Sequence, residues 1–225
     1  MVKGGVNLRA WFGSLRYSED LDIDAVRGSA HSLSAKVDKV IESATFGDLL
    51  ASRGLSVERV SKPKQTETTQ RWKFEIRSRE TAVPLHTKIE FSRRGSSEEF
   101  VLEPVRPEIV RPYGLPAPTA NHYTARSAIR QKIEALSHRA ETQARDVWDL
   151  EHLMRTTQAD PRPLTPLLEG AIPVAVDRIL SLPYEVFKAQ VVPFLAPEHQ
   201  EIYGTEDAWN RICELVIDRL KEIQG

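Results

Sequence analysis

The chain has 225 residues, of which 40% are hydrophobic and 28% charged, and its formal net charge is −1. This length allows one domain or two small ones, and the balanced composition excludes global disorder. The near-zero charge excludes a protein that simply coats nucleic acid, although a local basic groove remains compatible with it. The single cysteine, Cys213, excludes a disulfide framework or a thiolate zinc site within the chain. Because no signal core or membrane-length apolar segment is visible, we expect a cytoplasmic protein with no membrane partner.

The first quarter of the chain carries both helix and strand signals. Residues 7–12 are predicted to form a short helix directly after Gly4 and Gly5. Residues 20–26 alternate acidic with apolar side chains, which predicts a half-buried strand. Apolar residues then recur at helical spacing, which predicts a helix within residues 29–55.

Two later runs predict a pair of strands. Residues 71–78 and 86–94 both alternate apolar with charged side chains, so we expect an antiparallel pair with one wet face. Residues 99–112 are a weaker strand candidate, because prolines interrupt them.

Proline and glycine crowd residues 111–123, and we place the domain boundary there. The remainder of the chain is predicted to be helical, at residues 126–155, 164–181, 184–195 and 206–223. The sequence therefore predicts an α+β fold, with a mixed α/β domain at 1–115 and a helical domain at 116–225.

Asp20, Asp22 and Asp24 occupy every second position of the predicted strand at 20–26. Their carboxylates project from one face of a strand, where they repel one another unless a cation lies opposite. In a nucleotidyl transfer, two such carboxylates share Mg²⁺, and a third from a neighbouring strand completes the site. We assign the first role to Asp20 and Asp22 and the second to Glu90. The alternative is a solvated strand face, because a D-x-D pattern alone is weak.

Gly4 and Gly5 precede the predicted helix at 7–12, and backbone N–H groups at the start of a helix bind anions readily. The alternative is an ordinary tight turn. A glycine turn, a short helix and a D-x-D strand within so few residues nevertheless have the layout of a nucleotidyltransferase active site.

Lys132, Arg139 and Asp146 follow one another at seven-residue intervals in the predicted helix at 126–155. On one continuous helix they would lie together at the edge of the apolar stripe. We assign Lys132 and Arg139 to the phosphates of a nucleotide, and Asp146 to orienting a base or a lysine. An ordinary charged helix flank is the alternative. Asp149 is expected to cap the helix or to pair within it.

These residues resemble the AbiEii/AbiGii toxin family of nucleotidyltransferases, which includes MenT-like toxins of type IV toxin–antitoxin systems. The opening motif of the family reads Lys-Gly-Gly-Thr-x-Leu-Arg and, after a gap, Arg-x-Ser-x-Asp-Leu-Asp. Ten residues of this sequence match it: Lys3, Gly4, Gly5, Leu8, Arg9, Arg16, Ser18, Asp20, Leu21 and Asp22. Residues 88–94 and 131–153 resemble its later strand and helical motifs.

The resemblance implies a nucleotidyltransferase-like mixed β-sheet with helices, followed by a C-terminal helical bundle. It also implies Mg²⁺ bound by Asp20 and Asp22, with Lys132 and Asp146 in the active site. Because MenT-type relatives transfer nucleotides to the 3′ end of tRNA, we expect an NTP, a tRNA acceptor and a cognate antitoxin as partners. The predicted catalytic residues are Asp20, Asp22, Glu90, Lys132 and Asp146. The predicted nucleotide-binding residues are Lys3, Gly4, Gly5, Arg16, Ser18, Lys88 and Arg139.

Two departures from the family pattern leave other functions open. Val6 stands where a Thr or Ser hydroxyl is usual, and family members usually carry a helix and most of a strand before the lysine and glycines. One alternative is therefore a catalytically silent binding module of the same fold. Another is a transferase that acts on a small hydroxylated molecule, for which an acidic pocket is expected. A basic groove near Arg93, Arg94 and Arg126 would favour tRNA instead.

Overall fold

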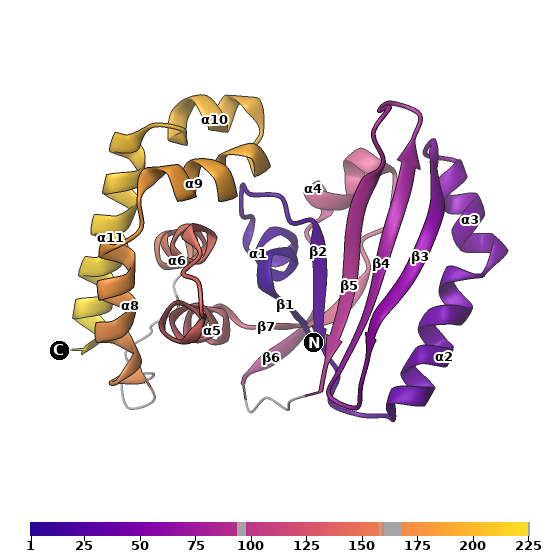
Figure 1. The fold of residues 1–225 in the computed structure, drawn as a ribbon, viewed down its shortest axis with the longest axis horizontal. Coiled ribbons are helices and arrows are strands. Elements are labelled where there is room, and N and C mark those ends of the chain that lie inside the picture. The colour runs from indigo at the N-terminus through magenta and orange to yellow at the C-terminus, as the bar shows by residue number, and fades with distance from the viewer. Residues whose placement is uncertain (94–97, 158, 160–167, 225) are drawn as a thin grey trace. The chain divides into compact units, whose positions relative to one another are not determined.

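The computed structural model describes residues 1–93, 98–157, 159 and 168–224 (Figure 1). The chain forms two compact units, one made of Met1–Lys3 and Glu19–Ser97, the other of Gly4–Ser18 and Glu98–Gly225. The expected α+β architecture, a mixed sheet with helices followed by a helical region, is confirmed. The division predicted between residues 115 and 116 differs from these units and stays a prediction.

Five strands form the sheet of the first unit, in the order β3-β4-β5-β2-β1. Their bounds are β1 (Val2–Lys3), β2 (Asp20–Asp24), β3 (Leu55–Gln65), β4 (Thr69–Ser78) and β5 (Leu85–Ser92). The pair β2 and β5 is parallel and the other neighbours are antiparallel, so the sheet is mixed. The predicted strand at 20–26 and the predicted antiparallel pair at 71–78 and 86–94 are confirmed.

The edge strand β3 has no counterpart among the predicted elements. It contains Pro63, which lies where the register with β4 shifts between Ser61 and Lys64. Proline removes a ladder hydrogen bond and is therefore tolerated mainly at edges and bulges. Pro63 therefore explains both why the sequence does not predict a strand here and why the strand lies at the edge of the sheet.

Two helices, α2 (Ala30–Ile41) and α3 (Ala44–Ala51), cover one face of this sheet (Figure 1). The single helix predicted within 29–55 is wrong, because Ser43 ends the run by capping α3: its hydroxyl accepts a hydrogen bond from the Phe46 N–H. Asp38 on α2 fastens the layer, accepting a hydrogen bond from Trp72 Nε1 (2.9 Å) and pairing with Lys62 Nζ (2.7 Å).

The helical layer leaves an apolar pocket of about 300 Å³ against the sheet. Its walls are apolar side chains of β2, β4 and β5 on one side and of α2 and α3 on the other, together with Lys36. Neither helix contains a fully buried residue. Apolar side chains of the sheet therefore face this layer, whereas the charged ones alternate to the opposite face.

The second unit is mainly helical. Its elements are α1 (Gly4–Phe12), β6 (Phe100–Pro104), α4 (Pro107–Val110), η1 (Arg111–Tyr113), β7 (Thr119–Tyr123), α5 (Ala125–His138), α6 (Ala144–Thr156), α8 (Ala171–Leu180), α9 (Tyr184–Gln190), η3 (Val192–Phe194), α10 (Pro197–Tyr203) and α11 (Glu206–Gln224). One continuous hydrophobic core joins α1, α5, α6, α8, α9 and α11. It includes the stacked rings of Phe187 and Trp209.

Several predictions for this half are confirmed and others need correction. The helix at 206–223 and the short strand within 99–112 are present, as α11 and β6. The proline-rich stretch at 111–123 contains the unpredicted strand β7, which pairs with β6. The helix predicted at 164–181 is observed in part, as α8, which begins after a turn at Glu169 and Gly170. Its first four residues, 164–167, lie outside the described part of the chain. The helix predicted at 184–195 is α9 followed by η3.

The single helix predicted at 126–155 is wrong, because α5 ends at His138 and α6 begins at Ala144. The break contains neither glycine nor proline. Instead, two distant side chains stabilise its ends: Arg178 Nη1 donates to the carbonyls of Leu136 and Arg139, and Gln190 Oε1 accepts from the Ala144 N–H at 2.9 Å. Long-range capping therefore divides this run.

No helix within the described part of the chain combines the length and the apolar character that crossing a membrane requires.

Candidate active site

The carboxylates of β2 meet charged residues of β5 on one face of the first unit's sheet. The parallel register places Asp20 beside Lys88 and Asp22 beside Glu90. Lys88 Nζ lies 2.7 Å from Asp20 Oδ2 and donates a hydrogen bond to it. Each of these residues is thus positioned by strand alternation and by the β2–β5 register.

Glu90 is held from the opposite side by β4. Arg71 Nε donates to Glu90 Oε2 at 2.6 Å, and Arg71 Nη2 lies 2.5 Å from the same oxygen. A guanidinium that uses two nitrogens on one carboxylate fixes its orientation. Glu90 therefore lies beside Asp22 in the register, while its carboxylate is engaged by Arg71.

Asp22 is the exception among the acidic residues of β2 and β5 on this face, because its side chain makes no hydrogen bond or ion pair with any described residue. Burial raises the pKa of its carboxyl above the usual range, Lys88 and Lys3 oppose this effect, and Glu90 and Asp20 reinforce it. A half-buried carboxylate with two acidic neighbours is a favourable place for a cation.

The residues present fit a magnesium site formed by Asp20 and Asp22. Among the described residues, no three His, Cys, Asp or Glu side chains gather around a common metal position. Mg²⁺ does not require such a cage, since it usually keeps several waters and binds one or two carboxylates together with substrate phosphates. Asp22, whose carboxylate has no hydrogen-bond or ion-pair partner among the described residues, lies next to Asp20 and meets that requirement.

Lys3, on β1, lies directly opposite Asp22 in the antiparallel register. Its ammonium nevertheless contacts Asp24, with Nζ 2.5 Å from Oδ1. The third aspartate of the alternating run therefore has a cationic partner within the sheet.

A second group of charges lies inside the second unit, centred on Asp149 of α6. Arg16 donates to both of its oxygens, from Nη2 to Oδ2 at 3.1 Å and from Nε to Oδ1 at 3.3 Å. Lys132 of α5 lies with Nζ 2.6 Å from Asp149 Oδ2 and 2.8 Å from Asp146 Oδ1. Both aspartate side chains are 0% exposed.

These contacts decide the charge states within the cluster. Burial alone would lower the pKa of Lys132, but Asp146 and Asp149 outweigh it, and the net pKa is raised. Burial alone would raise the pKa of Asp149, but Lys132 and Arg16 outweigh it, and the net pKa is lowered. Lys132 and Asp149 therefore keep their ionised forms, in which each of the two buried charges is paired.

Arg139 lies in the turn after α5 and reaches Asp146, with Nη1 3.4 Å from Oδ2. That buried oxygen accepts no hydrogen bond from the described residues. Lys132, Arg139 and Asp146 are therefore close together, as predicted. They meet because a turn joins α5 to α6, and not because they lie on one continuous helix.

The two glycines at the start of α1 have distinct structural reasons. Gly4 has a φ of 66°, a left-handed conformation that residues with a side chain rarely adopt. A Cβ on Gly5 would lie 2.8 Å from Ser18 Oγ and 3.0 Å from Arg16 Nη2. Gly5 thus gives room to the guanidinium that binds Asp149.

The predicted residues fall into two groups, one in each unit. The first unit holds Lys3, Asp20, Asp22, Lys88 and Glu90, and the second holds Gly4, Gly5, Arg16, Ser18, Lys132, Arg139 and Asp146. The interpretation of Asp149 as a residue pairing within its own helix is wrong, because its partners are Arg16 and Lys132. The three-residue spacing of Asp146 and Asp149, which puts both on one helix face, was the available signal.

Solved structures share this fold. "Crystal structure of putative nucleotidyltransferase from H. pylori" covers 100% of this chain and 89% of its own, with a TM-score of 0.56 and 17% identity. "Crystal structure of JHP933 from Helicobacter pylori" covers 99% of this chain and 85% of its own, with a TM-score of 0.54 and 17% identity. At this level of identity, the likeness shows a common fold.

The sequence comparison is more specific. Residues 1–218 match the family described as "Nucleotidyl transferase AbiEii toxin, Type IV TA system". The chain belongs to this family of nucleotidyltransferase toxins, which confirms the resemblance seen in the motifs. No curated protein matches the sequence.

Proposed function

We propose that this protein is a Mg²⁺-dependent transferase that moves a nucleotide from an NTP to an RNA acceptor, the 3′ end of tRNA. It acts in the cytoplasm as the toxin of its system and is neutralised by a cognate antitoxin. Family membership supports the reaction class. The half-buried carboxylate of Asp22 with its acidic neighbours Asp20 and Glu90 supports the metal.

The reaction forms one bond and breaks one bond. The acceptor hydroxyl oxygen bonds to the α-phosphorus, its proton is removed, and pyrophosphate leaves. When bound, Mg²⁺ would neutralise phosphate charge and lower the pKa of the attacking hydroxyl. Asp20 and Asp22 would hold it, and Glu90, which Arg71 keeps in one orientation, would accept the proton.

The second group of residues is assigned to the triphosphate. Lys132 and Arg139 supply positive charge, and Asp146 and Asp149 hold the Lys132 ammonium in place. Gly4 and Gly5 at the start of α1, together with Lys3, Arg16, Ser18 and Lys88, are assigned to nucleotide binding. Of these, Arg16 also fixes Asp149 through its bidentate contact.

The proposal is tested by incubating the purified protein with Mg²⁺, total tRNA and each labelled NTP in turn. We expect label on tRNA from the wild type and a loss of at least ~100-fold in Asp22→Ala, since a metal-binding carboxylate acts on the reaction itself. Asp24→Ala is the matched control on the same strand, because Asp24 already has Lys3 as a partner.

Equal labelling by Asp22→Ala and wild type would contradict the mechanism. Label on a small hydroxylated molecule, with none on tRNA, would show that the acceptor is that molecule and that the reaction is still nucleotidyl transfer. A folded protein that binds no NTP in the presence of Mg²⁺ would show a silent binding module.

A further inference from the structure

The outer strands of the first unit carry cations on the same sheet face as Asp20 and Asp22. The register defines two rows across the strands. One row runs from Lys73 on β4 to Lys88 on β5 and Asp20 on β2. The other runs from Lys64 on β3 through Arg71, Glu90 and Asp22. Each row contains one outer lysine, on β3 or β4, and one candidate metal ligand on β2.

Both rows show the same pattern of pairing. The inner cation binds a carboxylate: Lys88 binds Asp20 at 2.7 Å, and Arg71 binds Glu90 at 2.5 Å. The outer cations, Lys64 and Lys73, are exposed and make no ion pair with any described residue.

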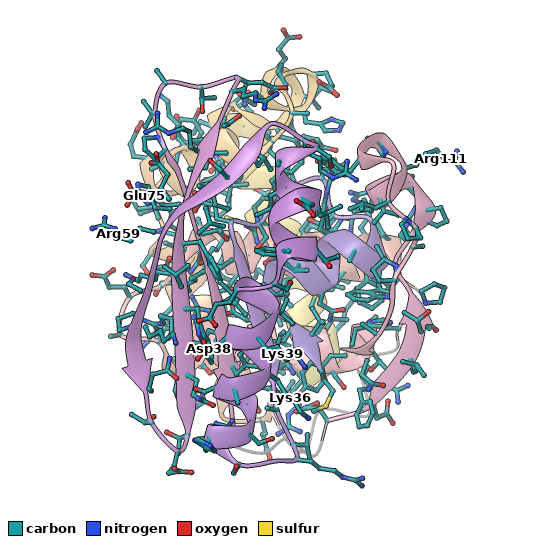
Figure 2. The ribbon with its side chains drawn as sticks, turned by 90° about the vertical axis from the view of Figure 1, so that its right-hand side faces the viewer. Lys36, Asp38, Lys39, Arg59, Glu75 and Arg111 are labelled. Atoms are coloured by element: carbon teal, nitrogen blue, oxygen red, sulfur yellow. The ribbon has the colours of Figure 1, made fainter. Side chains whose placement is uncertain are left out.

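Within the sheet, each outer lysine lies opposite a cation and not opposite a carboxylate. Lys73 lies directly opposite Lys88, and Lys64 directly opposite Arg71. Like charges in directly opposed positions destabilise a strand pair. Arg59 on β3 avoids this situation, since it pairs with Glu75 at 2.6 Å. Figure 2 labels both side chains. An anion bound at Lys64 and Lys73 would relieve the repulsion.

The spacing favours a chain of phosphates over one phosphate. Adjacent strands are about 4.8 Å apart, so Lys73 lies about 10 Å and Lys64 about 14 Å from β2 along the sheet. The two lysines thus stand at increasing distances from the carboxylates. A nucleic-acid strand whose end is at Asp20 and Asp22 presents phosphates in this way.

Other candidate basic positions are less suited. Arg93 donates to Gln70 Oε1 at 2.6 Å, and Arg126 pairs with Glu99 at 3.8 Å. Arg94 lies outside the described residues. Among the described residues of the first unit, Lys64 and Lys73 are exposed cations without an ion pair on the sheet face that carries the candidate metal ligands.

We propose that the charged face of β3 and β4 binds the phosphate backbone of the RNA acceptor, with Lys64 and Lys73 as the phosphate contacts. This inference rests on the proposed function, because it assigns a surface to the acceptor of that reaction. It predicts binding through charge and without reading of base sequence.

The test is the salt dependence of tRNA binding by the full chain, measured without NTP so that no chemistry takes part. The logarithm of the tRNA association constant falls linearly with the logarithm of the salt concentration. In Lys64→Gln/Lys73→Gln the magnitude of this slope should be smaller than in the wild type by about 1.4–1.8. The same loss weakens binding by about 25- to 60-fold at ~0.1 M salt. Lys64→Arg/Lys73→Arg should retain the slope and the affinity.

Lys36→Gln/Lys39→Gln is the matched control, because these exposed lysines lie on α2, over the opposite face of the sheet (Figure 2). It removes the same two charges and should leave the slope unchanged. Equal losses in both double variants, no loss at Lys64 and Lys73, or no tRNA binding by the wild type would each overturn the inference.

Transfer of label from NTP to tRNA is measured separately on the same proteins. Transfer by the wild type with an unchanged tRNA KM in Lys64→Gln/Lys73→Gln would overturn this inference and leave the proposed function standing. If tRNA binding depended on Lys64 and Lys73 but no label were transferred, this inference would stand and the proposed function would be overturned.

Discussion

Asp22 lies half-buried on β2 beside Glu90 and Asp20, and burial raises the pKa of its carboxyl. An acid whose folded-state pKa is raised binds its proton more tightly in the folded state than in the unfolded state. The free energy of unfolding therefore falls as pH rises from the unfolded pKa, about 3.9, through the folded one. At neutral pH the full cost of ionising Asp22 falls on the folded protein.

Asp22→Asn is therefore expected to stabilise the protein at pH 7 without divalent metal, on the order of 1 kcal/mol or about 2–4 °C in Tm. Thermal unfolding in a chelator at pH 7 measures this, and the gain should vanish at a pH below the unfolded pKa. Added Mg²⁺ should raise the Tm of the wild type and not that of the variant.

Asp24→Asn provides the contrast on the same strand. Asp24 is bound by Lys3, so its replacement removes an ion pair and should give no stabilisation at any pH. A Tm gain of the same size in Asp24→Asn, or a loss in Asp22→Asn at pH 7, would refute this account of Asp22.

At the scale of elements, the predictable and unpredictable parts of the candidate site separate clearly. Strand alternation is local, so the placement of Asp20 and Asp22 on one face followed from the sequence, and so did a strand carrying Lys88 and Glu90. The division of residues 126–155 into α5 and α6 did not, because Arg178 and Gln190, far along the chain, cap the break. Nothing within residues 139–143 signals an end.

The same reason explains why the role of Asp149 was missed. Its partner Arg16 is separated from it by 133 residues. Helical periodicity places Asp149 on a face but does not show what that face meets. The order of the motifs pointed to Arg16 and Lys132 as candidate site residues. Only the fold shows that Asp149 is the partner of both.

Asp149 lies on α6 and connects it to α5 through Lys132 and to the segment after α1 through Arg16. Its replacement should therefore destabilise all three segments. Asp149→Asn leaves Arg16 and Lys132 buried with a net positive charge, and we expect a loss of about 3–5 kcal/mol in the free energy of unfolding. Urea denaturation measures it, through a lower midpoint at an unchanged slope.

This loss should be constant between about pH 5 and 9. The lowered pKa of Asp149 gives stability that is present above its unfolded pKa of about 3.9 and is lost as pH falls further. The raised pKa of Lys132 gives stability that is present below about 10.4 and is lost as pH rises further. Glu151→Gln on the same helix removes a charge whose ion pair, within the described part of the chain, is with the partly exposed Arg155, and it should cost about 1 kcal/mol or less. A similar cost for both variants would contradict the special role of Asp149.

At the scale of the whole molecule, the two units differ in how their helices are packed. The helices of the second unit share one hydrophobic core that contains fully buried residues from α5, α6, α8, α9 and α11. In the first unit, α2 and α3 contribute no fully buried residue and stand over an apolar pocket of about 300 Å³. Side chains that line such a space lose dispersion contacts on one side.

The consequence of this pocket concerns motion. A helical cover with few buried contacts is expected to detach and return while the sheet beneath stays intact, as a separate cooperative segment of low stability. Native-state hydrogen exchange should therefore show lower opening free energies for amides of α2 and α3 than for those of β4 and α6. Val37→Leu, which adds volume inside the pocket, should slow exchange in α2 and leave α6 unchanged. If the amides of α2 exchanged only through global unfolding, the two helices would be a fixed part of the first unit. If α2 opens alone, the sheet that carries Asp20 and Asp22 keeps its register while the helices over it open and close.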